Sequence, residues 1–256
     1  MIGGRSALLS AAGGGSPYGN WTGNYSDVSL LLRNGAPALV PVDESPTPKT
    51  ITTFGNAGMS TTTFKYGGSS LALDGSGDHA TIPFDAGFEF GTGDFTVEGW
   101  FYFVDINTTL RGIVALGDGA NALGPVTNSW SLLYLGSEGS NQIAFHRYNG
   151  ATVISYITTG VSVTPNSWHH IAVCRGSGIL RIFFNGVSYY SASNAVNYSV
   201  VNASHPLRVG LQYYGPQAAY DGPRYWNGFI DDLRITKGVA RYTKNFLPPP
   251  AELPAI

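Results

Sequence analysis

The chain has 256 residues, of which 43% are hydrophobic, 13% aromatic and 12% charged. This composition can fill the core of one large all-β domain, with Ser, Thr, Asn and Gly covering the surface. The formal net charge is -2 and no run of Lys or Arg occurs, so we expect no nucleic-acid binding. The single cysteine, Cys174, excludes a disulfide within the chain. No apolar run approaches the ~20 residues of a membrane span.

The N-terminal residues 1–26 are rich in Gly, Ser, Asn and aromatic residues and follow neither a helical nor a strand period. We therefore predict an extended N-terminal arm outside the core, held in place by a partner surface. The apolar stretch after Arg5 is too short to predict a signal peptide. The domain itself is predicted to span residues 27–250, with a C-terminal tail at residues 251–256.

Short β-rich runs separated by turn residues begin at residue 27, at the spacing of an antiparallel sandwich. In residues 94–104, DFTVEGWFYFV, the odd positions from Phe95 to Phe103 are apolar or glycine, whereas the even positions are polar or aromatic. This alternation is typical of a strand with one core face and one semi-polar face. The pair Asn185-Gly186 predicts a type I′ hairpin. The predicted fold class is all-β, an antiparallel two-sheet sandwich.

Four segments carry a family resemblance by their order and spacing: KYGGSSLALDGSGDHATIP (65–83), FEFGTGDFTVEGWFYF (88–103), NSWHHIAVCRGSGILRIFFNGV (166–187) and WNGFIDDLRITKGVARYTKNFLPPP (226–250). Together they resemble the concanavalin A-like, laminin-G-like jelly-roll family, in the branch found in bacteriophage virion and tail proteins. The resemblance covers roughly residues 27–250 and implies a jelly-roll sandwich. It does not define the function, because this fold carries lectins, adhesion modules, glycosidases and structural domains.

Two adjacent carboxylates, Asp231 and Asp232, lie inside a predicted strand, where neighbouring side chains project to opposite faces. They therefore cannot flank one sugar bond. Asp231 is predicted to share its face with Phe229 and Leu233, so it must accept backbone donors or bind a cation. In related jelly-roll modules the aspartate at this position helps to hold a structural calcium with the start of the domain, and the resemblance implies Asp27 as its companion. The alternative is a hydrogen-bonded structural aspartate.

The catalytic motifs known for this fold are absent from the sequence. Its glycosidase members place carboxylates on one strand as E-x-D-x-x-E, so that acid and nucleophile lie about 5 Å apart. The sequence has no such motif, and Asp94 and Glu98 are roughly 13 Å apart along a strand. No G-x-S-x-G elbow is present. The adjacent His169 and His170 face opposite ways and cannot share a metal. The sequence therefore predicts a non-enzymatic protein.

The run LDGSGDHATIPFD, residues 73–85, places Asp74, Ser76 and Asp78 at the odd positions of a calcium loop. The match fails further on, because His79 replaces the required glycine and Asp85 stands where a bidentate Glu is needed. We predict a glycine-rich hairpin between two strands here.

Aromatic side chains near loops are the remaining candidates for ligand binding, because flat rings stack on the CH faces of sugars. The loop at residues 212–226, QYYGPQAAYDGPRYW, is the best predicted recognition loop. Aromatic residues also line cores and subunit interfaces, and this alternative stays open. The candidate ligand-binding residues are Trp130, Tyr213, Tyr214, Tyr220, Tyr225 and Trp226.

These observations lead to three hypotheses about function. The first is a non-enzymatic bacteriophage virion-surface protein that contacts other virion proteins through its arm and binds a host cell-surface glycan. The second is a purely structural capsid-decoration or tail subunit that works by protein contacts. The third, disfavoured by the missing carboxylate motif, is a glycoside hydrolase. The resemblance to virion proteins also makes a homotrimer a candidate assembly.

Overall fold

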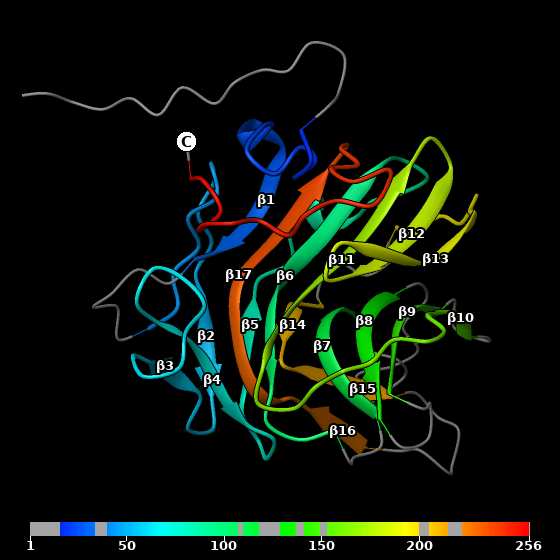
Figure 1. Cartoon of the computed structure of the whole chain (residues 1–256). Helices are drawn as coiled ribbons and strands as arrows, with labels where there is room; N and C mark the ends of the chain where they lie inside the picture. The colour runs from blue at the N-terminus through cyan, green and yellow to red at the C-terminus, as the bar shows by residue number, and fades with distance from the viewer. Residues whose placement is uncertain are drawn as a thin grey trace, which may run out of the picture.

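The computed structural model is a two-sheet antiparallel jelly-roll sandwich, which confirms the predicted fold class (Figure 1). It describes residues 16–33, 40–106, 110–117, 129–136, 141–148, 153–199, 205–214 and 222–255. Within these ranges, none of the helices has the length and apolar character needed to cross a membrane.

One layer is an eight-stranded sheet with the order β13-β12-β11-β6-β17-β4-β3, and β1 also pairs with β17. Its long central strands are β6 and β17, which run antiparallel side by side. The bounds are β1 Val28–Leu32, β3 Gly58–Ser60, β4 Ser70–Asp74, β6 Phe95–Phe103, β11 Trp168–Gly176, β12 Ile179–Phe184, β13 Val187–Ser193 and β17 Asn227–Lys237.

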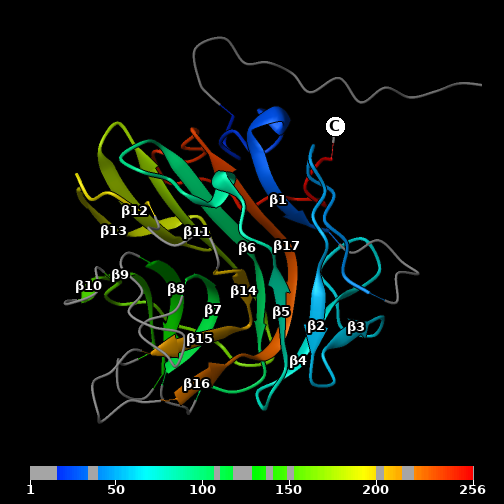
Figure 2. The same cartoon turned by 180° about the vertical axis from the view of Figure 1, so that it is seen from behind.

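The second layer is a seven-stranded sheet with the order β10-β9-β8-β7-β14-β5-β2, and it faces the first layer in Figure 2. A separate hairpin, β15-β16, contacts β7. The bounds are β2 Thr52–Phe54, β5 His79–Ile82, β7 Leu110–Leu116, β8 Ser129–Leu135, β9 Gln142–Tyr148, β10 Val153–Ile157, β14 Leu207–Val209, β15 Leu211–Tyr214 and β16 Gly222–Tyr225. Two short 3-10 helices, η1 Tyr25–Asp27 and η2 Ala86–Phe88, complete the described elements.

The main core lies between the two sheets and is made by alternate residues of the facing strands. In β6, Phe95, Val97, Phe101 and Phe103 all belong to this core, as their alternation predicts. The Asn185-Gly186 hairpin between β12 and β13 is also confirmed, since the two residues have φ angles of 48° and 79°. Positive φ at both turn positions is what a type I′ turn requires.

The part of the outer face of the eight-stranded sheet around Glu98 and Arg234 is covered by chain rather than left to solvent. Residues 16–26, predicted to lie outside the core, instead contact this face: the Arg234 guanidinium donates to the Trp21 carbonyl and the Arg241 guanidinium donates to the Asn20 carbonyl. The side chain of Trp21 packs against the buried residues there. Residues 16–26 are therefore held by contacts with the domain itself, and the boundary at residue 26 stays a prediction. Residues 1–15 of the predicted arm lie outside the described residues.

The predicted hairpin at residues 73–85 is wrong. Strand β4 belongs to the eight-stranded sheet and β5 to the seven-stranded sheet, so the turn between them crosses from one layer to the other. The glycine-rich sequence correctly indicates a tight turn, because Gly75 and Gly77 both have positive φ. Turn chemistry alone does not distinguish a turn within a sheet from one between sheets. This crossing places polar side chains at the rim of the sandwich.

Candidate functional site

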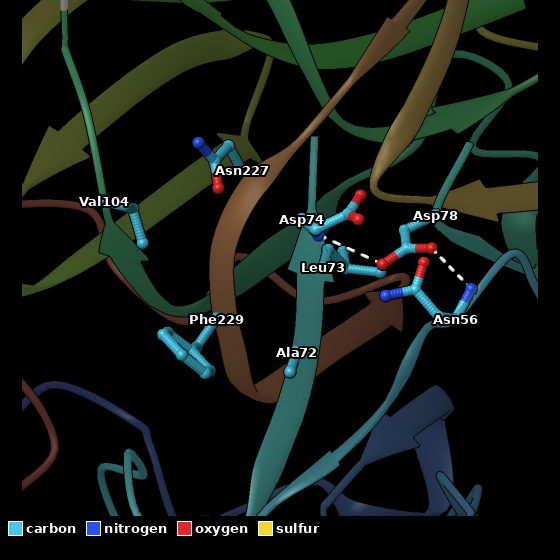
Figure 3. A pocket seen from close by; sticks show the side chains of 8 residues that line it. All are labelled: Asn56, Ala72, Leu73, Asp74, Asp78, Val104, Asn227 and Phe229. Carbon is cyan, nitrogen blue, oxygen red and sulfur yellow. Dashed lines mark hydrogen bonds between the residues drawn. The ribbon is translucent and has the colours of Figure 1, made fainter. Parts of the chain in front are cut away.

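A pocket of about 250 Å³ lies at this rim, where the β4–β17 pair ends. We call it the rim pocket. Figure 3 shows Phe229 and Val104 on one side of it and Asp74, Asp78 and Asn56 on the other. The residues that line it are Asn56, Ala72, Leu73, Asp74, Asp78, Val104, Asn227 and Phe229.

Strand alternation explains why these residues meet. In β4, Leu71 and Leu73 belong to the main core, so Ala72 and Asp74 turn to the outer face of the sheet. Asn227 of β17 is directly opposite Asp74, and Phe229 is opposite Ala72. One apolar pair and one polar pair therefore lie next to each other on the same face.

The carboxylate of Asp78 fixes the wall of the rim pocket. It is 1% exposed, and its two oxygens accept from the backbone N–H groups of Asn56 at 2.7 Å and Asp74 at 3.1 Å (Figure 3). Gly55 is needed for this approach, since a Cβ there would lie 2.3 Å from the Asp78 carboxylate. Asp78 therefore ties the β2–β3 turn to the end of β4, and its role is structural.

A second set of contacts, on the protein side of the rim pocket, fixes the side chain of Asn227. Its side-chain amide donates to Asp105 at 2.7 Å, and the Asp105 carboxylate pairs with Arg111 at 3.1 Å. Arg111 also donates to the Tyr225 carbonyl at 2.8 Å. The Gly75 turn approaches so closely that a Cβ there would lie 2.9 Å from the Asn227 Cβ. These contacts hold the Asn227 amide oxygen toward the pocket.

The polar atoms without a hydrogen-bond partner among the described residues determine what the rim pocket can bind. One oxygen of the exposed Asp74 accepts from the Ser76 N–H at 2.8 Å, and the hydrogen bonds among the described residues leave the other oxygen and the Asn227 side-chain oxygen without a donor. The exposed side-chain amide of Asn56 is likewise without a partner in the described part of the chain. The half-buried ring of Phe229 contacts Tyr102 edge-on at 5.5 Å. The pocket thus combines hydrogen-bonding side chains with an aromatic wall.

The adjacent carboxylates Asp231 and Asp232 do not line the rim pocket and are buried under other segments of the chain. A β-bulge in β17 gives them a geometry that differs from the predicted one. Asp231 is opposite Trp100 whereas Arg234 is opposite Glu98, so β17 has one extra residue here, and Asp232 has a φ of 49°. The bulge shifts every residue after it to the other face of the strand. Leu233 faces the main core, while Asp231 and Arg234 face outward.

The prediction that the two carboxyl groups project to opposite faces is therefore wrong. The Asp231 carboxylate accepts from the N–H groups of Lys65 and Tyr66 at 2.8 and 3.1 Å, and the Asp232 carboxylate accepts from the Leu253 N–H at 3.0 Å. The three donors belong to segments that cover the outer face of the sheet. Burial raises the pKa of Asp231 to about 6, and burial together with Asp231 raises the pKa of Asp232 well above its ordinary value.

Glu98 is buried on the same outer face with a different set of partners. Arg234 donates to it at 2.6 Å, Tyr242 donates to it at 2.6 Å, and His170 lies 3.3 Å away. Burial alone would raise the pKa of Glu98, but Arg234, His170 and Arg241 outweigh burial and hold this pKa well below its ordinary range. These residues form a structural ion cluster beneath the terminal segments.

The structure does not bring Asp27 and Asp231 together as ligands of a calcium ion. Val28 pairs with Thr236, five residues from Asp231, so Asp27 lies roughly 15 Å or more from Asp231 along the strand. Asp27 is exposed, whereas both oxygens of Asp231 accept backbone N–H groups. Within the described ranges, no group of three or more His, Cys, Asp or Glu side chains could hold a metal ion.

The predicted aromatic ligand-binding residues are distributed over the molecule rather than gathered at one site. Trp130 and Trp226 are 1% and 0% exposed in the main core, so neither can stack on a sugar, and their predicted binding role is wrong. Tyr225 is half-buried, with its ring 6.1 Å from that of His79. Tyr213 and Tyr214 have described backbone in β15 but their side chains are outside the described residues, as is the whole of Tyr220.

The rim pocket is not among the sites that the sequence predicts. The spacing of Asp74 and Asp78 resembles only an incomplete calcium loop, and Asn227 and Phe229 belong to the motif that includes the two adjacent aspartates. The usable signal was the i, i+2 alternation in β4 and β17, which places Asp74 and Asn227 on outer faces. Their pairing across the two strands depends on the topology of the sheet.

The comparison with known protein families points to the same fold as the structure. Residues 74–241 match the family Laminin_G_3, described as the concanavalin A-like lectin/glucanases superfamily. The chain therefore belongs to this family. A search of curated proteins returned no match to the chain.

Solved structures share this fold at low sequence identity. Domain 4 of AbnA, an extracellular arabinanase of family GH43 from Geobacillus stearothermophilus, solved in complex with arabinotriose, is 18% identical with a TM-score of 0.60 over 84% of this chain and 94% of that one. The binding domain of Paraclostridial Mosquitocidal Protein 1 is 15% identical, with a TM-score of 0.59 over 83% of this chain and 49% of that one. The binding domain of Botulinum Neurotoxin DC in complex with SialylT is 15% identical, with a TM-score of 0.58, over 85% and 49%. This chain spans about half the length of the two toxin chains.

Proposed function

We propose that this protein is a non-enzymatic carbohydrate-binding module and that the rim pocket is its binding site. The observation that carries the proposal is the pairing of Asp74 with Asn227 directly beside the ring of Phe229. Sugars need this combination, because their hydroxyl groups take directional hydrogen bonds while their CH faces pack on aromatic rings. The pocket volume of about 250 Å³ is below the range of drug-sized sites and suits one sugar ring.

The structural neighbours support binding of carbohydrate by this fold. AbnA domain 4 was solved with arabinotriose, and another neighbour, botulinum neurotoxin type C, depends for cell entry on two ganglioside molecules. At identities of 18% and 16% these similarities do not transfer residues, so the site is argued from the rim pocket of this chain alone.

The arrangement of carboxyl groups favours binding over hydrolysis. A glycosidase needs a carboxylic acid with a raised pKa next to the scissile bond, and a second carboxylate across it. Glu98, Asp231 and Asp232 are buried carboxyl groups with displaced pKa values, and none of the three lines the rim pocket. Asp78, which does line it, has both oxygens bound to backbone N–H groups.

A glycan array tests the proposal. The wild-type protein is expected to bind a subset of glycans, and Asp74→Ala is expected to lose that binding while it folds normally. Asp27→Ala is a matched control, because Asp27 is also exposed and η1, which carries it, lies at the opposite end of the sandwich from the end of β4 (Figures 1 and 2). Absence of binding to every glycan would contradict the proposal and favour the structural-subunit hypothesis. Hydrolysis of a bound glycan that is abolished by Asp74→Ala would contradict the non-enzymatic assignment.

The finer predictions from the family resemblance concern where the module works. A place on the surface of a bacteriophage virion, contacts with other virion proteins through residues 1–26, and a homotrimer stay predictions. The packing of residues 16–26 against the domain supports a fixed origin for such an arm, because Arg234 and Arg241 hold the carbonyl groups of that segment. Deletion of residues 1–15 in a virion-assembly assay would test the docking role without removing those contacts.

A further inference from the structure

The hydrogen-bonding groups of the rim pocket are mostly acceptors. The available acceptors are one oxygen of Asp74 and the side-chain oxygens of Asn227 and Asn56, and one hydrogen of the Asn227 amide is donated to Asp105. Among the side chains that line the pocket, the amides of Asn56 and Asn227 are the groups that can donate, and Asp105 already accepts one of the two Asn227 amide hydrogens. A ligand that fits must therefore bring donors of its own, as sugar hydroxyl groups do.

The charge around the rim pocket is negative. Asp74 and Asp78 line it, and Asp105 lies directly behind Asn227. None of the lining residues is Lys, Arg or His. The nearby cation, Arg111, donates to both oxygens of Asp105 and to the Tyr225 carbonyl, so its guanidinium is engaged on the protein side. A ligand carboxylate in the pocket would meet Asp74 with no lining cation to offset the repulsion.

We infer that the rim pocket selects uncharged saccharide units and rejects acidic ones such as sialic acid. This inference rests on the proposed carbohydrate-binding function and adds the chemical class of the ligand. A neutral sugar ring packs its CH face against Phe229 and Val104 and donates hydroxyl hydrogens to Asp74 and Asn227. Two unit charges about 5 Å apart near a protein surface repel each other enough to change affinity by roughly tenfold or more.

Paired glycans test this selectivity. Each pair consists of a neutral glycan and the same glycan capped with sialic acid, and the affinities of wild-type protein for both are measured by biolayer interferometry at low and at 0.5 M salt. The expected result is binding of the neutral member at least about tenfold tighter, with a smaller difference at high salt because ions screen the repulsion. Asp74→Asn removes the charge and is expected to narrow the difference, whereas Asp27→Asn, the same change on a distant exposed aspartate, is expected to leave it unchanged.

Tighter binding of the sialylated members, or a preference that Asp74→Asn does not alter, would overturn the inference while leaving carbohydrate binding intact. Failure of the wild-type protein to bind any neutral or sialylated glycan would overturn the proposed function, and this inference with it.

Discussion

The outer face of the eight-stranded sheet has two regions with similar polar residues, one under the terminal segments and one at the rim pocket. In the first region these residues bind groups of the chain, and in the second they stay available to a ligand. Under the terminal segments, Glu98, Asp231 and Asp232 are at most 2% exposed and are held by groups of the chain itself. A few residues along β17, at the rim, Asp74 and Asn227 keep oxygen atoms directed to the pocket. The buried carboxyl groups with displaced pKa values are thus architectural, whereas the carboxylate of Asp74 is exposed and open to a ligand.

The covered region contains two buried carboxyl groups, Glu98 and Asp232, whose burial is compensated in different ways. Glu98 has Arg234, Tyr242 and His170 around it, which keeps it ionised. Asp232 has one backbone donor, Leu253 N–H, and its other oxygen is buried without a partner. The cost of burying charge is therefore offset by neighbouring cations at Glu98, whereas at Asp232 burial raises the pKa and favours the protonated form. Equal burial gives opposite pKa directions because the partners differ.

The largest expected effect follows from Glu98→Gln. The change leaves Arg234 buried with an uncompensated charge, and we expect the free energy of unfolding to fall by about 3–5 kcal/mol. Urea unfolding followed by tryptophan fluorescence measures this loss. Glu252→Gln is the matched control, because Glu252 pairs with Arg33 at 3.7 Å near the surface and such pairs contribute about 1 kcal/mol or less. A loss below about 1 kcal/mol for Glu98→Gln would show that the ion cluster does not stabilise the fold.

The next effect is the pH dependence that Asp231 contributes. Its folded pKa of about 6 lies above the unfolded value of about 3.9, so its stabilising contribution is complete below pH 4 and is lost as the pH rises through 6. The contribution is on the order of 3 kcal/mol for a shift of this size. It is isolated as the difference between wild type and Asp231→Asn in chemical denaturation from pH 4 to pH 8. A difference that does not vary with pH would mean that Asp231 stays ionised across the range.

The smallest change in stability is expected for Asp232→Asn, although it converts a carboxyl group to an amide as Glu98→Gln does. Because the pKa of Asp232 is raised well above its ordinary value, the asparagine resembles the protonated acid. Asparagine also tolerates the φ of 49° at this bulge and can still accept from the Leu253 N–H. We expect a change of less than about 1 kcal/mol at neutral pH in the same urea assay. A loss as large as that of Glu98→Gln would remove the distinction between the two carboxyl sites.

The sequence predicts the sandwich well because its signals are local. The alternation from Phe95 to Phe103 and the Asn185-Gly186 turn each depend on a few neighbouring residues, and the structure confirms both. The prediction that Asp231 and Leu233 share a face is wrong because a single bulge at Asp232 shifts the alternation between them, and no glycine or proline at residues 231–234 indicates the bulge.

The candidate site was not predictable in the same way. Its lining residues come from the β2–β3 turn, from β4 and the turn after it, from the end of β6 and from β17, and only the strand order brings them together. The aromatic residues were a misleading signal, since Trp130 and Trp226 fill the core. Aromatic residues indicate burial as readily as binding, and the sequence does not distinguish the two.

Asp74→Ala extends the comparison to the rim pocket, where the effect on stability is expected to be slight and the effect on binding large. Asp74 is exposed and its carboxylate caps one turn through the Ser76 N–H, so the free energy of unfolding should change by less than about 1 kcal/mol. Affinity for a neutral glycan is expected to fall at least about tenfold, since a charge-assisted hydrogen bond contributes roughly 1.5–3 kcal/mol. Isothermal titration calorimetry and thermal unfolding on the same samples separate the two effects. Equal losses of stability and affinity would indicate a structural role for Asp74.

The most direct measurement of the central claim is an NMR titration of the labelled protein with a neutral glycan that it binds. We predict that the side-chain amide signals of Asn56 and Asn227 and the ring signals of Phe229 shift together as the glycan is added, with one dissociation constant. Shifts confined to residues 212–225, with those three side chains unchanged, would place binding on the tyrosine-rich loop and contradict the assignment of the rim pocket as the carbohydrate site.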